Sequence, residues 1–243
     1  MKNITTFDFK GLERFDKIYV LVSGGFDSIY LYEIIKNLFP KKTIPTNCFN
    51  PYEYNKTLKQ IENSDKNFIK IPPGNYKNII KKSFLKLPQA YKLKEQKKYH
   101  KKIFPCCRVL KHVNFLKNKR FKEDNTVIIS GIKRGDSHQR GIWLTQLSQG
   151  REPCNQFGIS FYHKHQTGQL YCYPFRDYMT RELPNDIKNE LWKRFPYLDH
   201  SGCVLCPVLV LFNLVSEGDR YQKSLKYARN LGVFPYKEII EVY

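Results

Sequence analysis

The chain has 243 residues, of which 41% are hydrophobic and 15% aromatic, a composition that excludes an intrinsically disordered protein. Its 42 Lys and Arg outnumber its 22 Asp and Glu, so the formal net charge is +20 at pH 7. A charge of that size attracts polyanions. The longest apolar run, residues 203–212, contains Pro207 and is too short to cross a bilayer. Because the first residues hold no apolar signal core, we expect a soluble, cytoplasmic protein without a membrane partner.

Short apolar runs alternate with stretches of helical spacing through the first part of the chain. This alternation predicts strands at 17–22, 43–49 and 68–71, followed in turn by helices at 27–38, 53–63 and 75–84. Residues 86–104 are polar and basic, and we expect an irregular loop or lid there. After Pro105 we expect a helix over 106–118 and then a strand over 126–130.

The second part of the chain opens with a different pattern. Alternating side chains on either side of residues 166–168 predict a two-stranded hairpin, and helices are expected over 184–195 and 219–232. Trp143 and Trp192 are expected in the core. Strands that alternate with helices predict an α/β fold with a mostly parallel central sheet and helices on both faces. We expect one domain over 1–243, with the small β-hairpin and a C-terminal helical part over 207–243.

Residues 23–28, with the sequence SGGFDS, join the first expected strand to the first expected helix. The free N–H groups and the dipole of a helix start favour an anion at such a turn. Glycines let the backbone approach a phosphate closely, and the serines add hydroxyl donors. The expected phosphate contacts are Ser23, Gly24, Gly25 and Ser28. Asp27 would complete a magnesium site, tie down the loop or complement the helix dipole, and the sequence leaves these three roles open.

The chain has seven cysteines, an odd count that argues against a disulfide framework. Four of them form two close pairs, Cys106-Cys107 and Cys203-x-x-Cys206. Four thiolates in two pairs suit a soft metal site, either zinc or an iron–sulfur cluster. Lys111 follows the first pair by one helical turn.

Residues 92–122 form a basic strip with twelve Lys or Arg and one acid, Glu95. A nucleic-acid partner would use such a strip for phosphate contacts. A solvated lysine-rich surface and a basic pocket for a charged nucleotide are the alternatives.

In combination, the motifs SGGFDS, CCRVLK and GCVLCP resemble the phosphoadenosine phosphosulfate (PAPS) reductase family of the PP-loop superfamily, which is Rossmann-like. The cysteine arrangement is most similar to that of its cluster-containing members, the adenylyl-sulfate (APS) reductases. Residues 131–140, GIKRGDSHQR, are similar to the family's GIRxxESxxR. Lys133 stands where the family prefers Arg, and Asp136 where it prefers Glu.

The resemblance implies roles for particular residues. The phosphates or sulfate of an adenine nucleotide would be held by Ser23, Gly24, Gly25, Asp27 and Ser28. Further nucleotide contacts would come from Lys111, Gly131, Lys133, Arg134 and Arg140. A [4Fe-4S] cluster would be held by Cys106, Cys107, Cys203 and Cys206. Zinc is the alternative metal, and Mg²⁺ would accompany ATP if ATP is the substrate.

The activity that the resemblance implies is reduction of APS or PAPS to sulfite and AMP or PAP, with a thioredoxin- or glutaredoxin-type donor. The family's nucleophilic cysteine lies in a C-terminal tail motif, whereas this sequence ends EIIEVY, so the catalytic residue is not identified. One alternative is a PP-loop enzyme that uses ATP, releases pyrophosphate and transfers sulfur to tRNA or DNA. Another is a non-catalytic nucleotide-binding relative. A homodimer is among the expected assemblies.

Overall fold

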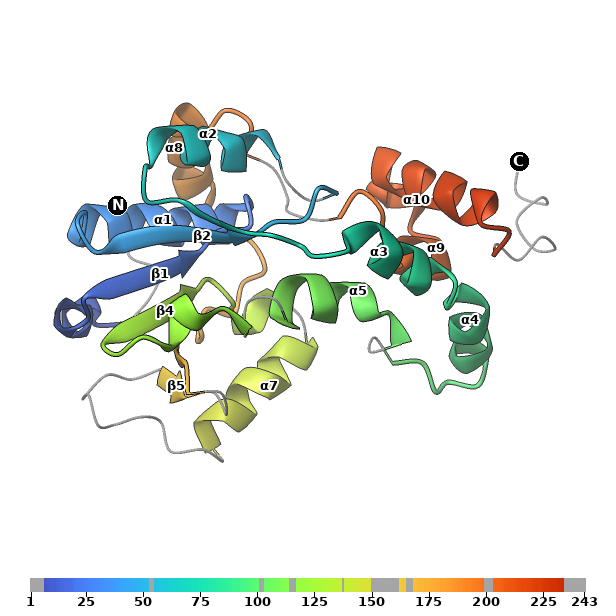
Figure 1. Cartoon of the computed structure of the whole chain (residues 1–243), viewed down its shortest axis with the longest axis horizontal. Coiled ribbons are helices and arrows are strands. Elements are labelled where there is room, and N and C mark those ends of the chain that lie inside the picture. The colour runs from blue at the N-terminus through green and yellow to red at the C-terminus, as the bar shows by residue number, and fades with distance from the viewer. Residues whose placement is uncertain are drawn as a thin grey trace. The chain divides into compact units, whose positions relative to one another are not determined.

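The computed structural model describes residues 7–52, 55–100, 103–113, 117–136, 138–149, 162–164, 168–198 and 203–233. The chain forms two compact units (Figure 1). Unit 1 comprises Met1–Asn47, Tyr54–Ile71 and Leu116–Ser201, and unit 2 comprises Cys48–Glu53, Pro72–Phe115 and Gly202–Tyr243. That both units act as one family domain stays a prediction. Within the described ranges, no helix has the length and apolar character that a membrane span requires.

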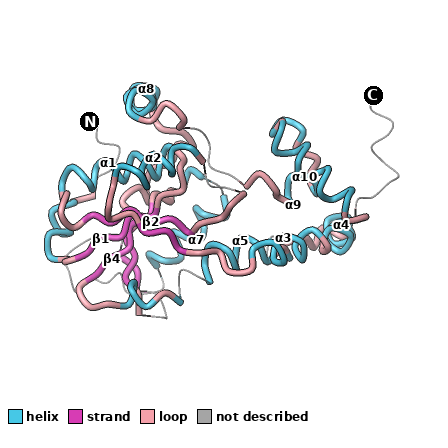
Figure 2. Tube along the Cα trace, turned by 45° about the horizontal axis from the view of Figure 1, so that its top comes forward, coloured by secondary structure: helices cyan, strands magenta, loops and turns pink. Residues whose placement is uncertain are grey.

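A six-stranded sheet forms the centre of unit 1 (Figure 2). Its strands are β1 (Lys17–Leu21), β2 (Thr43–Cys48), β3 (Ile69–Ile71), β4 (Thr126–Ser130), β5 (Tyr162–Lys164) and β6 (Leu170–Cys172). They lie in the order β3-β2-β1-β4-β6-β5. β1 is parallel to both β2 and β4, β4 is parallel to β6, and β5 is antiparallel to β6. The expected α/β fold is confirmed, as is the hairpin, whose turn at 165–167 lies outside the described residues.

The helices of unit 1 cover this sheet. They are η1 (Phe9–Arg14), α1 (Phe26–Leu38), α2 (Lys56–Ser64), η4 (Lys119–Lys122), η5 (Arg134–Asp136), α7 (His138–Gln149) and α8 (Asn185–Arg194). Side chains of α1, α2 and α8 share one hydrophobic core with Ile18 and Val20 of β1. On the opposite face, Tyr19 packs edge-on against Phe121 of η4, with ring centroids 4.8 Å apart. Burial on both faces explains why β1 reads as a continuous apolar run.

Unit 2 is helical among its described residues and has its own core. Its helices are α3 (Tyr76–Phe84), α4 (Leu87–Glu95), α5 (Pro105–Cys107), the π-helical segment η3 (Arg108–Val113), α9 (Pro207–Leu211), η7 (Val215–Glu217) and α10 (Asp219–Asn230). Phe84, Leu110, Leu209 and Leu225 are among the side chains buried in this core. The expected C-terminal helices are therefore present.

Two expectations about local structure were wrong, and one helix was missed. Part of the supposed loop at 86–104 is helix α4, because Leu87 and Ala90 bury one side of it. Helix α7 was not predicted, because its apolar residues, at 142–144 and 147, do not line a single face of the helix. The indoles of Trp143 and Trp192 are 37% and 44% exposed rather than in the core. They pack edge-on against Tyr173 and Phe26 instead.

Candidate active site

The direction of the chain reverses in the middle of the sheet of unit 1. From β1 the chain runs outward to β2 and β3, and it then returns to β4 on the other side of β1. Open α/β sheets bind ligands at such a switch point, in the crevice outside the carboxyl ends of the two strands. Residues 23–28 follow β1, and residues 131–140 follow β4. The structure therefore brings together the two segments that the sequence singled out for phosphate binding.

These two segments approach closely at Gly131. A β-carbon added to Gly131 would lie 3.1 Å from the carbonyl oxygen of Asp27, so a larger residue would push β4 away from the start of α1. The glycine is thus explained by packing between the two strand ends. Its expected nucleotide contact stays a prediction.

Ser28 organises the 23–28 loop from within. Its hydroxyl accepts a hydrogen bond from the Ser23 N–H at 3.0 Å and donates to the Gly25 carbonyl at 2.9 Å. The Ser23 and Ser28 hydroxyls are 3.1 Å apart. Gly25 occupies the N-cap position of α1 and has no side chain with which to cap the helix. The first-turn N–H groups of α1 therefore point into the loop, where an anion would accept them.

Asn55 holds the loop from outside, and sequence reasoning missed it. Its Nδ2 donates to the Gly24 carbonyl at 3.2 Å, while its Oδ1 accepts from the Leu58 N–H at 3.0 Å. Gly24 has a φ of +83°, and a β-carbon there would lie 2.5 Å from the Asn55 amide. An asparagine at a helix start is readable as an N-cap from sequence. Its second partner, Gly24, depends on how the strands assemble.

Lys133 lies under the loop and is 0% exposed. Its ammonium forms an ion pair with Asp27, and it lies 3.3 Å from Asp136 Oδ1. Burial raises the pKa of the Asp27 carboxyl, and the Lys133 ammonium opposes that rise. The pair removes most of the repulsion that Asp27 would exert on a bound phosphate. Of the three roles open for Asp27, the structure supports the one that ties down the loop, and a nucleotide contact of Lys133 stays a prediction.

Two arginines of the 131–140 segment differ in their surroundings. Arg140 is 53% exposed and bonds Asp136 Oδ2 at 2.5 Å, so its guanidinium lies at the surface beside the switch point. Arg134 is less exposed, and its guanidinium lies 3.5 Å from Asp177. Arg140 is therefore better placed than Arg134 to contact an anionic ligand. The nucleotide contacts of both arginines stay predictions.

In unit 2, buried serines hold the two cysteine segments in place. The Cys106 N–H donates to the Ser83 hydroxyl at 3.0 Å, and the Cys206 N–H donates to the Ser224 hydroxyl at 3.0 Å. Both serines are 0% exposed. Cys106 and Cys206 pack in the same hydrophobic cluster. The structure therefore brings the two segments into one core.

The thiol of Cys203 accepts a hydrogen bond from the side-chain amide of Asn50. The Nδ2 of Asn50 lies 3.3 Å from Cys203 Sγ, and Asn50 is buried. Amide donors to sulfur are a common feature around protein-bound metal sulfur centres. The donor set thus fits a soft metal or an iron–sulfur cluster in its chemistry.

The side chains of Cys107 and Lys111 lie outside the described part, although their backbone belongs to α5 and to η3. Among the side chains that the structure describes, no three of His, Cys, Asp or Glu are grouped as a metal site would require. Convergence of all four thiolates on one metal centre therefore stays a prediction.

No protein-family model and no curated protein sequence matches this chain. Among solved structures, the chain is similar to the U34-tRNA thiolase NcsA from Methanococcus maripaludis with its [4Fe-4S] cluster. The identity is 17%, the TM-score is 0.46, and the likeness covers 96% of this chain and 78% of that chain. The residues of the switch point and of the cysteine segments, rather than this likeness, support the function proposed next.

Proposed function

We propose that the chain is a PP-loop enzyme that binds ATP on the 23–28 loop, adenylates an acceptor and releases pyrophosphate. The observation that carries this proposal is the position of the loop, at the switch point and at the start of α1. Asn55 fixes the backbone of the loop, and Lys133 neutralises its carboxylate. The loop is therefore preorganised for an anionic group before the ligand arrives.

The proposed reaction is a displacement at the α-phosphorus. An acceptor oxygen forms a bond to that phosphorus, the bond to the β-phosphate oxygen breaks, and pyrophosphate leaves with its negative charge. The N–H groups of α1 and the hydroxyls of Ser23 and Ser28 would stabilise the charge on the phosphates. A sulfide-level sulfur donor would then replace AMP on the activated carbon, so that a C–S bond forms as the C–O bond breaks. Neither step needs an oxidant.

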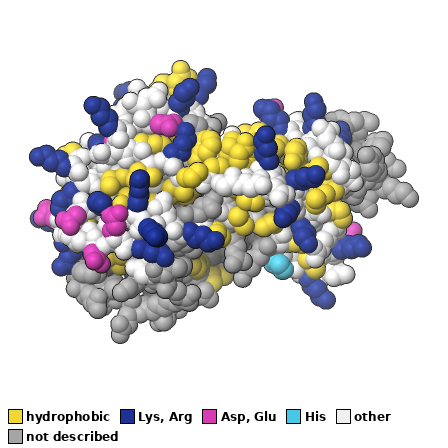
Figure 3. Space-filling model, in the orientation of Figure 1, with side chains coloured by type: hydrophobic (Ala, Val, Ile, Leu, Met, Phe, Trp, Pro, Cys, Tyr) yellow, Lys and Arg dark blue, Asp and Glu magenta, His cyan; other side chains and the backbone are white. Residues whose placement is uncertain are grey.

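A nucleic acid is the acceptor that the charge favours. The chain carries a net charge of +20, and Figure 3 shows Lys and Arg side chains spread over the visible face. Counterion release from a phosphate backbone would supply binding energy on such a surface. We therefore place the acceptor group on a nucleic acid.

The cysteine segments would hold the metal centre of this enzyme. The residues are Cys106, Cys107, Cys203 and Cys206. When bound, a [4Fe-4S] cluster would supply a redox-active iron centre, and zinc would supply a structural one. Asn50 would donate to the Cys203 ligand, and Ser83 and Ser224 would orient the two segments.

Sulfonucleotide reduction, the first expectation from the family resemblance, has less support. That reaction needs an accessible thiolate beside the nucleotide. Cys172 is 0% exposed in the core against β4, so it is not available as the nucleophile. Cys48, at the end of β2, is partly exposed, and Cys154 lies outside the described residues.

A single pair of assays separates the two reactions. Anaerobically purified protein is supplied with ATP and RNA, and pyrophosphate is measured; in parallel it is supplied with APS or PAPS, and sulfite is measured. We expect RNA-dependent pyrophosphate release that falls at least tenfold in Ser28→Ala, because the loop loses its internal hydrogen bonds. Lys66→Ala, an exposed lysine far along the chain from the loop, serves as the control. Sulfite release without pyrophosphate release would overturn the proposal.

A further inference from the structure

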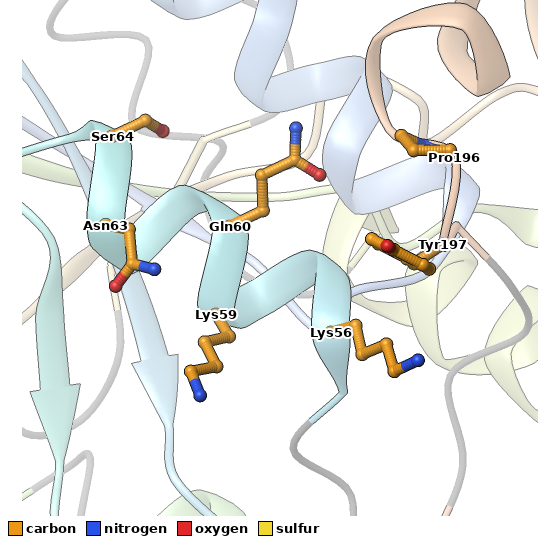
Figure 4. Close-up of a pocket in the computed structure, with 7 residues that line it drawn as sticks. All are labelled: Lys56, Lys59, Gln60, Asn63, Ser64, Pro196 and Tyr197. Carbon is orange, nitrogen blue, oxygen red and sulfur yellow. The ribbon is translucent and has the colours of Figure 1, made fainter.

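A groove on unit 1 lies outside the site described so far. It has a volume of about 670 Å³ and lies between α2 and the segment that follows α8 (Figure 4). Lys56, Lys59, Gln60 and Asn63 line it from α2, and Tyr197 lines it from the other side. None of the residues that line it is acidic. The groove thus combines two cations, two amides and one aromatic ring.

Tyr197 presents an accessible ring to this groove. The residue is 55% exposed, and the Lys56 ammonium lies 4.8 Å from the ring centroid. Figure 4 shows the side chains of Lys56, from α2, and Tyr197, from the segment after α8, next to one another. An exposed ring beside a cation is the pairing that proteins use to stack an unpaired base and hold its phosphate.

Asn63, rather than Gln60, gives the groove an accessible amide. Gln60 Nε2 donates to the Arg194 carbonyl at 2.9 Å and its Oε1 is buried, so the Gln60 amide ties α2 to the end of α8. Asn63 is exposed one helical turn further along α2. Its amide can both donate and accept, which suits the 2′-hydroxyl of a ribose.

Two residues near this groove contact the 23–28 loop, although neither lines the groove. Asn55, which holds the Gly24 carbonyl, directly precedes Lys56 in the chain. On the other side, Phe26 of the loop packs edge-on against Trp192 of α8, with ring centroids 5.2 Å apart. Trp192 is 44% exposed. A strand that leaves the groove at Lys56 is therefore directed to the loop that we assign to ATP.

We propose that the groove binds a single-stranded segment of the RNA substrate, with one base stacked on Tyr197 and backbone phosphates at Lys56 and Lys59. This inference rests on the proposed function for the identity of the reacting partner. It places RNA on α2 and the segment after α8 of unit 1 rather than on the basic strip at 92–122. Unpaired bases expose the face that stacks on an aromatic ring, whereas paired bases in a duplex do not.

Binding of a labelled single-stranded RNA oligonucleotide to the full chain, measured by fluorescence anisotropy without ATP, tests the groove. Tyr197→Ala is expected to weaken binding about tenfold or more, the loss of one base–aromatic stack. Tyr197→Phe keeps the ring and is expected to bind as the unchanged protein does. Lys56→Ala is expected to reduce the slope of log K against log salt by about 0.7. The control is Lys41→Ala, which removes the same charge from an exposed residue outside the groove.

The outcomes separate the groove from the proposed reaction. Equal RNA affinity in Tyr197→Ala and Tyr197→Phe would overturn the proposal that RNA binds in this groove, even if pyrophosphate release depends on RNA. Equal binding of a DNA oligonucleotide of the same sequence would overturn the assignment to RNA. Loss of binding in Tyr197→Ala, together with no pyrophosphate release under any condition, would leave the groove standing and overturn the adenylation reaction.

Discussion

Lys133 illustrates how a single buried charge connects the two segments of the candidate phosphate site. It comes from the segment after β4, and its ammonium pairs with Asp27 at the start of α1 and lies near Asp136. Full burial makes the lysine costly without these partners, whereas Asp27, whose side chain is 31% exposed, would cost less without the lysine. The site therefore depends on this contact as much as on the glycines of the loop.

Replacing Lys133 with Met would leave Asp27 without its buried cation, beside Asp136, which Arg140 still pairs. We expect the free energy of unfolding at pH 7 to fall by about 3–5 kcal/mol, as for other broken buried pairs. Burial already raises the pKa of Asp27, and without the lysine that pKa rises further. A carboxyl with a raised folded-state pKa gains relative stability as pH falls through it, so the deficit should shrink on acidification.

Urea denaturation of both proteins at pH 7 and at successively lower pH measures how the stability deficit changes. Lys70→Met is the matched control, because Lys70 and Glu62 form an exposed pair whose loss should cost no more than about 0.5 kcal/mol. A deficit in Lys133→Met that grows as pH falls would contradict the assignment.

Gly24 is required for two separable reasons. Its φ of +83° disfavours any side chain, and a β-carbon would also collide with Asn55. Gly168 has a φ of +89° but no atom within 4 Å of an added β-carbon, so it isolates the backbone effect. We expect Gly24→Ala to lose about 1–3 kcal/mol of stability and at least tenfold in ATP affinity.

Gly168→Ala should lose only about 1 kcal/mol and no ATP affinity. Thermal unfolding and nucleotide titration of both variants provide the comparison. Equal ATP affinity in the two variants would show that the contact between Gly24 and Asn55 does not shape the loop.

At the scale of elements, local patterns predicted most strands and helices. Apolar runs located β1 and β4, and Pro105 located the start of α5. The patterns failed where burial depends on a distant partner. In the nine-residue helix α4, the helical spacing of Leu87, Ala90 and Tyr91 covers only about one turn, and the core of unit 2 buries Leu87 and Ala90 completely.

Tyr91 provides a test of α4 as a packed helix. Its hydroxyl donates to the Val210 carbonyl of α9 at 3.0 Å, and burial raises the pKa of Tyr91 to about 12, so it keeps its proton at neutral pH. We expect Tyr91→Phe to reduce stability by about 1 kcal/mol and to speed amide exchange in α4. Tyr197→Phe, at an exposed ring, should change neither. Unchanged exchange in Tyr91→Phe would mean that this bond does not hold α4.

At the scale of the whole molecule, the two units have separate cores and separate candidate ligands. The 23–28 loop, which we assign to ATP, belongs to unit 1, and the cysteines 106, 107, 203 and 206 belong to unit 2. A ligand stabilises the part of the chain that binds it, by about 2.7 kcal/mol at one hundred times its Kd. The units should therefore respond to different ligands.

Hydrogen exchange followed by mass spectrometry tests this expectation. ATP should slow exchange in α1 and β4, and incorporation of iron and sulfide should slow exchange in α3 and α10. Removing the metal with a chelator should reverse only the second effect. An equal response of both units to each ligand would contradict the separate assignments.

The sequence by itself determined the alternation of strands and helices, the turn chemistry of SGGFDS and the pairing of the cysteines. These features follow from side-chain periodicity and backbone preferences within a few residues. Only the tertiary structure decided that Asn55 holds Gly24, that Lys133 pairs with Asp27, and that the Lys56 ammonium lies over the ring of Tyr197. Each of these contacts joins residues far apart in the chain, and whether they meet depends on strand order and packing, which no local pattern encodes.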